Sequence, residues 1–467
     1  MNIVESRELR LRDYLIYLFL LLIIVPLITG TVSDYYKVHY LSETEVAVLG
    51  LTDSVDSIIA FMSSIMAFGG YIICSKAIGK GDSAETSANY TSLLMLEVIP
   101  TGIISFLLVF FRYPVAGFIG ASESNGMLES CADAVAAYGL GIPGYVLLMT
   151  LSYFAFLDDR VRKYIVPVKI LEIPLTLIAN HLVTITAPTV FAYLTCGIIV
   201  DWVSVALFCY FIRKHSEIFR FTPKDISPRK ALHMLVIGLP EGMENVYYSL
   251  NRYFIYLYIL GKFSEKYKAS IEISGDISVI EDTLVFGMTL IFIERVGRSV
   301  GSGNSERERK DFKKLWIICI AGSLIFMVFL FFLYRFLADF YIGDYGADTE
   351  EILYHAKYFL SAYALSFPLY IANHLFVSTY DLREMIWHMH IIRFLEFVGL
   401  LVLYSHLLGD TLGIIGIWIA YPVTEATVLI INILLVIIHY RRLPSFRELG
   451  YIKEKASDGS VLGADAG

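Results

Sequence analysis

Two short stretches, Lys-Ala-Ile-Gly-Lys-Gly-Asp-Ser at residues 76–83 and Arg-Ser-Val-Gly-Ser-Gly-Asn-Ser at residues 298–305, repeat one pattern at an offset of 222 positions. Each stretch follows a long apolar segment and precedes another. The glycines allow a helix to end in the left-handed conformation, and the Asp or Asn and the Ser can cap the next helix. We therefore interpret both stretches as equivalent helix–turn–helix connections of an internal repeat.

Two further matches extend the repeat at nearly the same offset. Lys-Ile-Leu-Glu at 169–172 corresponds to Arg-Phe-Leu-Glu at 393–396, at an offset of 224, and Pro143 corresponds to Pro368 at an offset of 225. Three matches in the same order predict the duplication of a six-helix unit. Because six is even, both units should have the same orientation, related by an axis along the membrane normal with a cavity between them. This architecture is more typical of a transporter than of an enzyme.

The composition is that of an integral membrane protein. The chain is 57% hydrophobic and 18% charged, with a mean hydropathy of +0.64, whereas soluble domains carry about 25% charged residues. Twelve apolar stretches have the length that spans a bilayer: 14–34, 46–74, 88–111, 132–156, 164–186, 190–212, 231–260, 271–293, 315–341, 352–379, 386–408 and 412–439. The expected fold class is all-α, with twelve transmembrane helices as two parallel six-helix repeats around a central cavity. We expect an N-terminal lobe at 1–220, a C-terminal lobe at 221–450 and a disordered tail at 451–467.

The distribution of Lys and Arg predicts the orientation in the membrane. Alternate loops are basic, beginning with Arg7, Arg10 and Arg12 and ending with Arg441 and Arg442, whereas the intervening loops are poor in positive charge, except 261–270 with its three lysines. By the positive-inside rule, both termini face the cytoplasm. The N-terminal apolar run is not followed by a small-residue cleavage site, so we interpret it as a retained first helix. The expected location is the cell (inner) membrane, as a multi-pass protein.

The motifs of several enzyme classes are missing from the sequence. There is no Walker lysine loop, no Gly-x-Gly-x-x-Gly between a strand and a helix, no zinc-binding His-Glu-x-x-His and no Gly-x-Ser-x-Gly elbow. The five cysteines are dispersed and suggest neither a disulfide framework nor a metal site. We therefore expect no enzymatic activity and no cofactor, with an ion gradient of H⁺ or Na⁺ as the energy source.

Ionisable residues inside the predicted helices are hypotheses for function, because charge is costly at membrane depth. The first half offers Asp34 and Asp201 with Asn180, and we assign a substrate cavity in the second half to Glu244, Tyr247, Asn251, Arg252, Glu281 and Asp282. Two alternatives stay open. The pairs Lys169/Glu172 and Arg393/Glu396 are spaced to neutralise one another on their own helices, and Arg252 with Glu281 and Asp282 is as consistent with a structural ion pair as with a functional one.

Acids exceed bases in these segments, which favours a cationic substrate or coupling to protons. The 32 tyrosines and 31 phenylalanines add aromatic faces that bind organic cations through cation–π contacts. We expect a small, cationic amphipathic substrate, the lipid bilayer as surroundings, no nucleic acid and a monomeric protein.

The chain resembles the multidrug and toxic compound extrusion (MATE) family. The resemblance is carried by the turns Gly79–Asp82 and Gly301–Asn304, by Gly238-Leu239-Pro240, by Leu412-Gly413-Ile414-Ile415-Gly416-Ile417-Trp418 and by Arg393. It implies a V-shaped twelve-helix antiporter that exports organic cations, drugs or metabolites in exchange for Na⁺ or H⁺ by alternating access.

The same resemblance implies a coupling-cation site in the first half. Asp34, in Ser33-Asp34-Tyr35-Tyr36, matches a carboxylate late in helix one, and Asn180 matches an asparagine in helix five. The family often has an aspartate one turn after that asparagine, where this chain has Thr184, and Asp201 is a candidate substitute. The acids that another branch of the family uses in helices seven and ten are not cleanly matched, which favours the DinF-like side.

Two other functions compete with cation-coupled export. A flippase or exporter of a lipid-linked or polysaccharide substrate belongs to the same superfamily, but its cavity should be basic to bind phosphates. A polytopic membrane enzyme using Asn180-His181 or a pair of acids is the alternative of another class, and the repeat across both halves argues against it.

Overall fold

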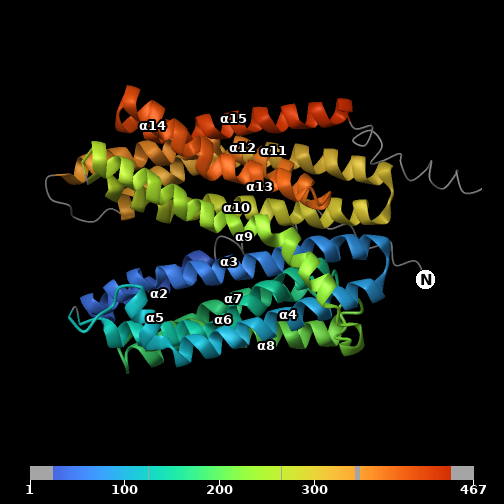
Figure 1. The fold of residues 1–467 in the computed structure, drawn as a ribbon, viewed down its shortest axis with the longest axis horizontal. Helices are drawn as coiled ribbons and strands as arrows, with labels where there is room; N and C mark the ends of the chain where they lie inside the picture. The colour runs from blue at the N-terminus through green and yellow to red at the C-terminus, as the bar shows by residue number, and fades with distance from the viewer. Residues whose placement is uncertain (1–24, 125, 265, 342–347, 443–467) are drawn as a thin grey trace, which may run out of the picture. The chain divides into compact units, whose positions relative to one another are not determined.

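The computed structural model describes residues 25–124, 126–264, 266–341 and 348–442. Helices make up nearly all of this part of the chain, and it contains no strand (Figure 1). Each of the twelve predicted apolar stretches lies almost entirely on helix where it is described, with turn residues at Phe111, Ile185, Thr186 and Gly413. Residues 14–24 of the first stretch lie outside the described residues. The all-α prediction is therefore confirmed.

The Cα positions form two compact units, Met1–Asn245 and Val246–Gly467. The helices of the first unit, together with its short 3-10 and π segments, are α2 (Val25–Tyr40), α3 (Glu43–Lys80), α4 (Ser83–Phe110), α5 (Arg112–Phe118), α6 (Leu128–Leu157), η2 (Arg162–Tyr164), α7 (Ile165–Ala179), η3 (Asn180–Thr184), α8 (Val190–His215) and η4 (Pro223–Asp225). Helix α9 (Pro228–Lys262) begins in this unit and ends in the second.

The second unit continues with α10 (Lys266–Ser302), α11 (Ser305–Tyr341), α12 (Thr349–Leu382), α13 (Ile386–Phe394), η6 (Leu395–Gly399), α14 (Leu400–Leu412) and α15 (Ile414–Arg442). Segments η3 and η6 are single π-helical turns, a form that often marks functional positions within longer helices. Here α7 with η3, and α13 with η6 and α14, each form one membrane span, Arg162–Thr184 and Ile386–Leu412.

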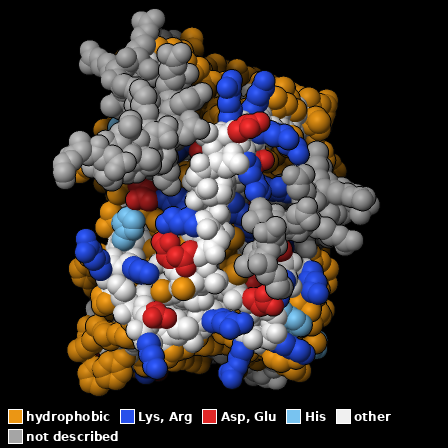
Figure 2. Space-filling view, turned by 90° about the vertical axis from the view of Figure 1, so that its right-hand side faces the viewer, with side chains coloured by type: hydrophobic (Ala, Val, Ile, Leu, Met, Phe, Trp, Pro, Cys, Tyr) orange, Lys and Arg blue, Asp and Glu red, His pale blue; other side chains and the backbone are white. Residues whose placement is uncertain are grey.

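Nine helices among the described residues are long and apolar enough to cross a membrane. The first predicted span, on α2, is described only in part, and α9 and α10 are interrupted by charged side chains such as Glu244, Arg252 and Glu281. On the face that Figure 2 draws, Lys, Arg, Asp and Glu side chains are numerous, and hydrophobic side chains lie toward the edges of the view. This is the distribution expected where loops meet the boundary between lipid and water.

The two repeated turns have the geometry that their sequences predict. Gly81 and Gly303 are left-handed, with φ of 73° and 68°. The side chain of Asp82 then accepts a hydrogen bond from the backbone N–H of Glu85 at 2.8 Å, and Asn304 accepts one from that of Arg307 at 2.9 Å. Each turn therefore ends one helix with a glycine and starts the next with a side-chain cap.

The linker after α8 is held against α4 by a row of buried hydroxyl groups. Ser87 donates to the carbonyl oxygen of Ile218 at 2.8 Å, and the backbone N–H groups of Thr222 and Ser227 donate to Thr91 and Ser92, each at 2.9 Å. Hydroxyl side chains thus satisfy backbone groups of an irregular segment that has no regular partner.

The start of α9 packs directly onto α3 through glycines. Gly238 and Gly242 form a Gly-x-x-x-Gly pair, the spacing that allows membrane helices to approach closely. A Cβ atom at Gly238 would lie 1.9 Å from the carbonyl oxygen of Ile65, and one at Gly69 would lie 1.9 Å from that of Met234. The backbones of α3 and α9 are therefore in direct contact at these glycines, where a side chain would not fit.

These two contacts account for the position of the boundary between the units. The sequence places it at residue 220, whereas the compact units divide after Asn245, inside α9. The linker and the first half of α9 belong with the first unit because the hydroxyl row on α4 and the glycine crossing with α3 hold them there. The predicted tail at 451–467 lies outside the described residues.

Candidate functional site

The predicted residues Asn180 and Thr184 lie together in the π turn η3. The Asn180 amide donates to the carbonyl oxygen of Thr176 at 2.9 Å, and the Thr184 hydroxyl donates to the Asn180 side-chain oxygen at 3.4 Å. Thr184 also lies 3.5 Å from the sulfur of Cys196 on α8. Both side chains are buried, so they form a compact polar cluster between α7 and α8.

Asp34 does not join this cluster. Its side chain is 62% exposed and pairs with Lys37, three residues later on α2, at 2.9 Å. Among the described residues, no hydrogen bond or ion pair links Asp34 to Asn180, Thr184 or Asp201. The Tyr36 hydroxyl lies 3.3 Å from Nδ1 of His181, so α2 does reach η3 through a different side chain.

Asp201 on α8 lies in a second polar group of the first unit. Lys169 donates to both carboxylate oxygens of Glu172, at 2.9 and 3.1 Å, and Ser204 donates to the same carboxylate at 3.0 Å. Asp201 lies within the electrostatic reach of Lys169 and Glu172. Asp201 lies five positions after Cys196, about 7.5 Å along the helix. The predicted coupling-cation residues therefore lie in three places: Asp34 on α2, Asn180 with Thr184 in η3, and Asp201 on α8.

Sequence reasoning missed one fully buried acid in the first unit. Glu97 lies in the middle of α4 and has no exposed surface. Thr150 on α6 donates to one of its oxygens at 2.5 Å, and the other oxygen has no hydrogen-bond partner among the described residues. The available signal was a lone acid within the apolar stretch 88–111.

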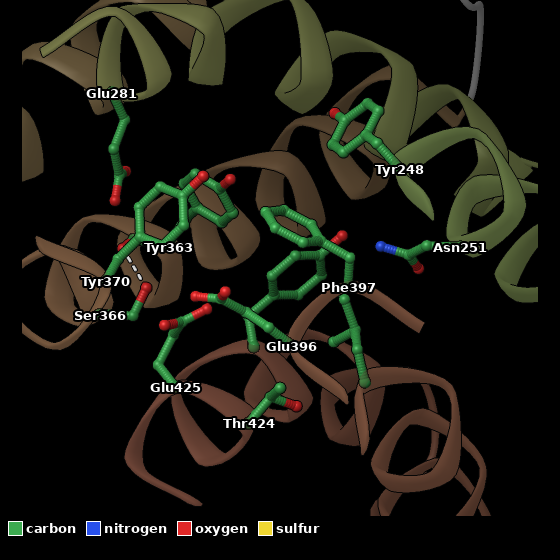
Figure 3. A pocket seen from close by; sticks show the side chains of 12 residues that line it. Tyr248, Asn251, Glu281, Tyr363, Ser366, Tyr370, Glu396, Phe397, Thr424 and Glu425 are labelled. Carbon is green, nitrogen blue, oxygen red and sulfur yellow. Dashed lines mark hydrogen bonds between the residues drawn. The ribbon is translucent and has the colours of Figure 1, made fainter. Parts of the chain in front are cut away.

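A small cavity lies wholly within the second unit, between α9, α10, α12, η6, α14 and α15 (Figure 3). It is lined by carboxyl groups, tyrosines and a few smaller side chains: Tyr248, Asn251, Glu281, Tyr363, Ser366, Tyr370, Glu396, Phe397, Leu401, Tyr421, Thr424 and Glu425. The centre of a water molecule can move through about 20 Å³ of it. Since one water needs roughly 10–15 Å³ by this measure, the cavity fits a water or a small cation rather than an organic molecule.

Two of the carboxyl groups face one another at the bottom of the cavity. Glu396, from the π turn η6, and Glu425, from α15, point toward each other in Figure 3 and interact directly. Both residues are buried. Two carboxylates this close in a buried site require a proton or a bound cation to offset their charge.

Arg393 supplies one positive charge from behind Glu396. Its guanidinium lies 3.3 Å from the Glu396 carboxylate and faces the ring of His374, with nitrogen–nitrogen distances of 2.8 and 3.0 Å. A neutral imidazole offers only one acceptor nitrogen, so Arg393 donates to one of the two. The predicted i,i+3 pairs Lys169/Glu172 and Arg393/Glu396 are thus both present.

Glu281 is the third acid of the cavity, on α10. The Tyr334 hydroxyl donates to one of its oxygens at 3.4 Å, while the other oxygen is buried with no hydrogen-bond partner in the described part of the chain. The hydroxyl of Thr424, also in the lining, is likewise buried without a partner there. Such groups are normally satisfied by water or an ion. In the described ranges, no three His, Cys, Asp or Glu side chains come close enough to hold a metal.

The structure brings two of the predicted substrate-cavity residues, Asn251 and Glu281, into the cavity lining. Asp282 accepts from the hydroxyl of Tyr370, a lining residue, at 3.4 Å. The other three lie elsewhere: Arg252 donates to the Tyr256 hydroxyl at 3.0 Å, Tyr247 packs edge-on against Phe394 at 5.7 Å, and Glu244 belongs to the first unit.

The comparisons with known proteins identify the family. The MatE family model matches residues 10–162 and 242–382, well over half of the chain, with one stretch in each half. No curated protein matches the chain.

Solved structures agree on the fold. A MATE transporter in complex with MaL6 has a TM-score of 0.81 at 15% identity, and the match covers 93% of this chain and 97% of that one. An outward-facing multidrug resistance MATE transporter of the MOP superfamily has a TM-score of 0.77 at 15% identity, covering 90% and 95%. A MOP superfamily transporter from Pyrococcus furiosus, for which a reversed polarity of the binding pocket suggests a different function, has a TM-score of 0.77 at 16% identity, covering 92% and 96%. The chain therefore belongs to the MatE family of multi-pass membrane transporters and has its all-α, twelve-helix fold.

Proposed function

We propose that this transporter is an antiporter that exports organic cations in exchange for H⁺ or Na⁺, and that the cavity of the second unit binds the coupling cation. The observation that carries the proposal is the set of three buried carboxyl groups, Glu281, Glu396 and Glu425, around a space of water size. Arg393 balances one of these charges, so a proton or a small cation is needed to balance the rest.

The size of the cavity shows which of the two ligands, the coupling cation or the organic substrate, it can hold. With space for about one water, it fits H⁺, carried on a carboxyl group, or a dehydrated Na⁺. An organic cation needs a larger site, so we no longer assign Asn251 and Glu281 to the substrate, and we assign them to the coupling cation instead. The excess of buried acids over buried bases in the described part of the chain supports a cationic substrate in either case.

Two alternatives receive less support. An exporter of phosphate-bearing lipids should have a basic substrate cavity, whereas acids outnumber bases among the buried side chains of the described residues. For a membrane enzyme built on Asn180-His181, the Asn180 amide is engaged with its own helix and His181 contacts Tyr36.

Transport driven by separate gradients tests the proposal. In proteoliposomes, an imposed H⁺ or Na⁺ gradient should drive uptake of a fluorescent organic cation. Glu425→Gln should reduce this uptake about tenfold or more, equivalent to ~1.4 kcal/mol, because the neutral amide cannot exchange a proton or balance a cation. Glu350→Gln, which changes an exposed acid on α12, is the matched control and should retain activity.

The same assay separates the two candidate coupling sites. Asp34→Asn should retain gradient-driven uptake if the cavity of the second unit is the site. Loss of coupling in Asp34→Asn together with full activity of Glu425→Gln would place coupling in the first unit. Indifference of the wild-type protein to both gradients would contradict antiport itself.

A further inference from the structure

A buried ladder of polar side chains leads away from the cavity between α12 and α15. The Asn373 amide donates to the carboxylate of Glu425 at 2.8 Å and to its backbone carbonyl oxygen at 3.0 Å. The Asn432 amide donates to the side-chain oxygen of Asn373 at 3.1 Å. The Tyr380 hydroxyl donates to the side-chain oxygen of Asn432 at 3.2 Å.

The rungs of this ladder follow a seven-residue spacing on each helix. Asn373 and Tyr380 lie seven residues apart on α12, as do Glu425 and Asn432 on α15, which keeps each pair on one face of its helix. Val377 and Val428 lie between the rungs in a buried apolar cluster. The polar groups are therefore enclosed by hydrocarbon, and their hydrogen bonds are made to one another.

Every donor in the ladder points toward Glu425. An amide donates through nitrogen and accepts through oxygen, and the observed bonds run in one sense from Tyr380 through Asn432 and Asn373 to the carboxylate. Chains of hydrogen bonds with one sense polarise each other and strengthen the last bond. Because an amide does not readily accept a proton and pass it on, the ladder is not a proton path. It is a fixed donor aimed at one carboxylate oxygen.

That donor stabilises the ionised form of the Glu425 carboxylate and therefore opposes the binding of a proton or a cation there. The charged and titratable groups around Glu425 are Glu396 facing it, Arg393 and His374 behind Glu396, Glu281 across the cavity and the tyrosines of the lining. Protonation of Glu425 gives a neutral acid, which accepts a weaker hydrogen bond from the Asn373 N–H, and Na⁺ at this oxygen must share its lone pairs with that N–H.

We propose that Asn373 is a positioning residue that sets the affinity of the cavity for the coupling cation, and that Asn432 and Tyr380 hold its amide in place. The inference rests on the proposed function of the cavity. Tyr380 does not line the cavity and lies about 10 Å along α12 from Asn373, so any effect of its hydroxyl on cation affinity must travel through the ladder.

The test measures how transport depends on the concentration of the coupling cation. Removing the competing donor in Asn373→Ala should lower the half-saturating H⁺ or Na⁺ concentration about tenfold. Tyr380→Phe keeps the ring and removes only the hydroxyl, and it should shift the same quantity in the same direction, by about twofold. Tyr354→Phe, which changes an exposed tyrosine on α12, is the matched control and should leave it unchanged.

The double variant provides a readout that a merely structural role would not move. Tyr380→Phe should have no further effect on the half-saturating concentration in the Asn373→Ala background. If Asn373→Ala does not fold, the half-saturating cation concentrations of Tyr380→Phe and Tyr354→Phe are compared, and this comparison alone tests the ladder. Equal half-saturating concentrations for these two variants, with gradient-driven uptake still reduced about tenfold or more in Glu425→Gln, would overturn the ladder and leave the proposed function standing. Intact coupling in Glu425→Gln would overturn both.

Discussion

Arg393→Met should destabilise the second unit by ~3–5 kcal/mol, the usual cost of removing one partner from a buried ion pair. Arg393 is 2% exposed, and it contacts both His374 and Glu396. Methionine retains much of the unbranched side chain but leaves the Glu396 carboxylate beside Glu425 without this cation.

The change can be followed in the second unit alone. Cys319, on α11, is the single cysteine of that unit and is buried, so its reaction with a thiol-specific maleimide on heating reports the unfolding of that unit. The onset temperature should fall sharply in Arg393→Met and partly recover in Arg393→Met/Glu396→Gln, because the second change removes the uncompensated charge. Arg335→Met, at an exposed position on α11, should behave like the wild type. Wild-type stability of Arg393→Met would show that the pair contributes nothing.

Gly238→Ala should destabilise the first unit strongly, because it adds a methyl group at a backbone contact between α3 and α9. The new Cβ would lie 1.9 Å from the carbonyl oxygen of Ile65 and 2.9 Å from the backbone nitrogen of Gly69. Neither is the flexible end of a side chain, so the helices must move apart. The cost should be ~1–3 kcal/mol or more, the range for overpacking a close contact.

A second glycine on α9 is the control for helix propensity. A Cβ at Gly261 meets nothing within 4 Å, so Gly261→Ala should be neutral or stabilising by up to ~1 kcal/mol. The readout is the reactivity of Cys74, which is buried on α3 five residues after Gly69. If Gly238→Ala and Gly261→Ala protect Cys74 equally on heating, the close crossing of α3 and α9 does not exist in the membrane.

Local features of the fold could be predicted from the sequence because they depend on neighbouring residues. Gly81 with Asp82, and Gly303 with Asn304, carry their turn geometry in their own backbone preferences. The apolar stretches are set by the thickness of the bilayer. The pairing of Asp34 with Lys37 also had a local signal, since Lys37 lies three residues later on the same helix face.

The cavity could not be predicted in this way. Its lining comes from six helical segments between Tyr248 and Glu425, and no local pattern records which faces of these segments meet. Glu396 enters the cavity from a π turn, which shifts the helix face by about one residue relative to a regular helix. Asn373 and His374 on α12 are uncharged polar residues within an apolar stretch and belong to no sequence motif, so no local pattern singles them out.

The hydroxyl row on α4 has a consequence for biosynthesis. Ser87, Thr91 and Ser92 lie in an early helix, but the backbone groups that they bind, in residues 218–227, are synthesised about 130 residues later. The glycines of α9 that pack against α3, Gly238 and Gly242, are likewise synthesised long after α3 itself. A nascent chain stopped at residue 220 would therefore hold an unfinished first half in the bilayer, and the first unit can close only when the opening turns of the seventh span have been made.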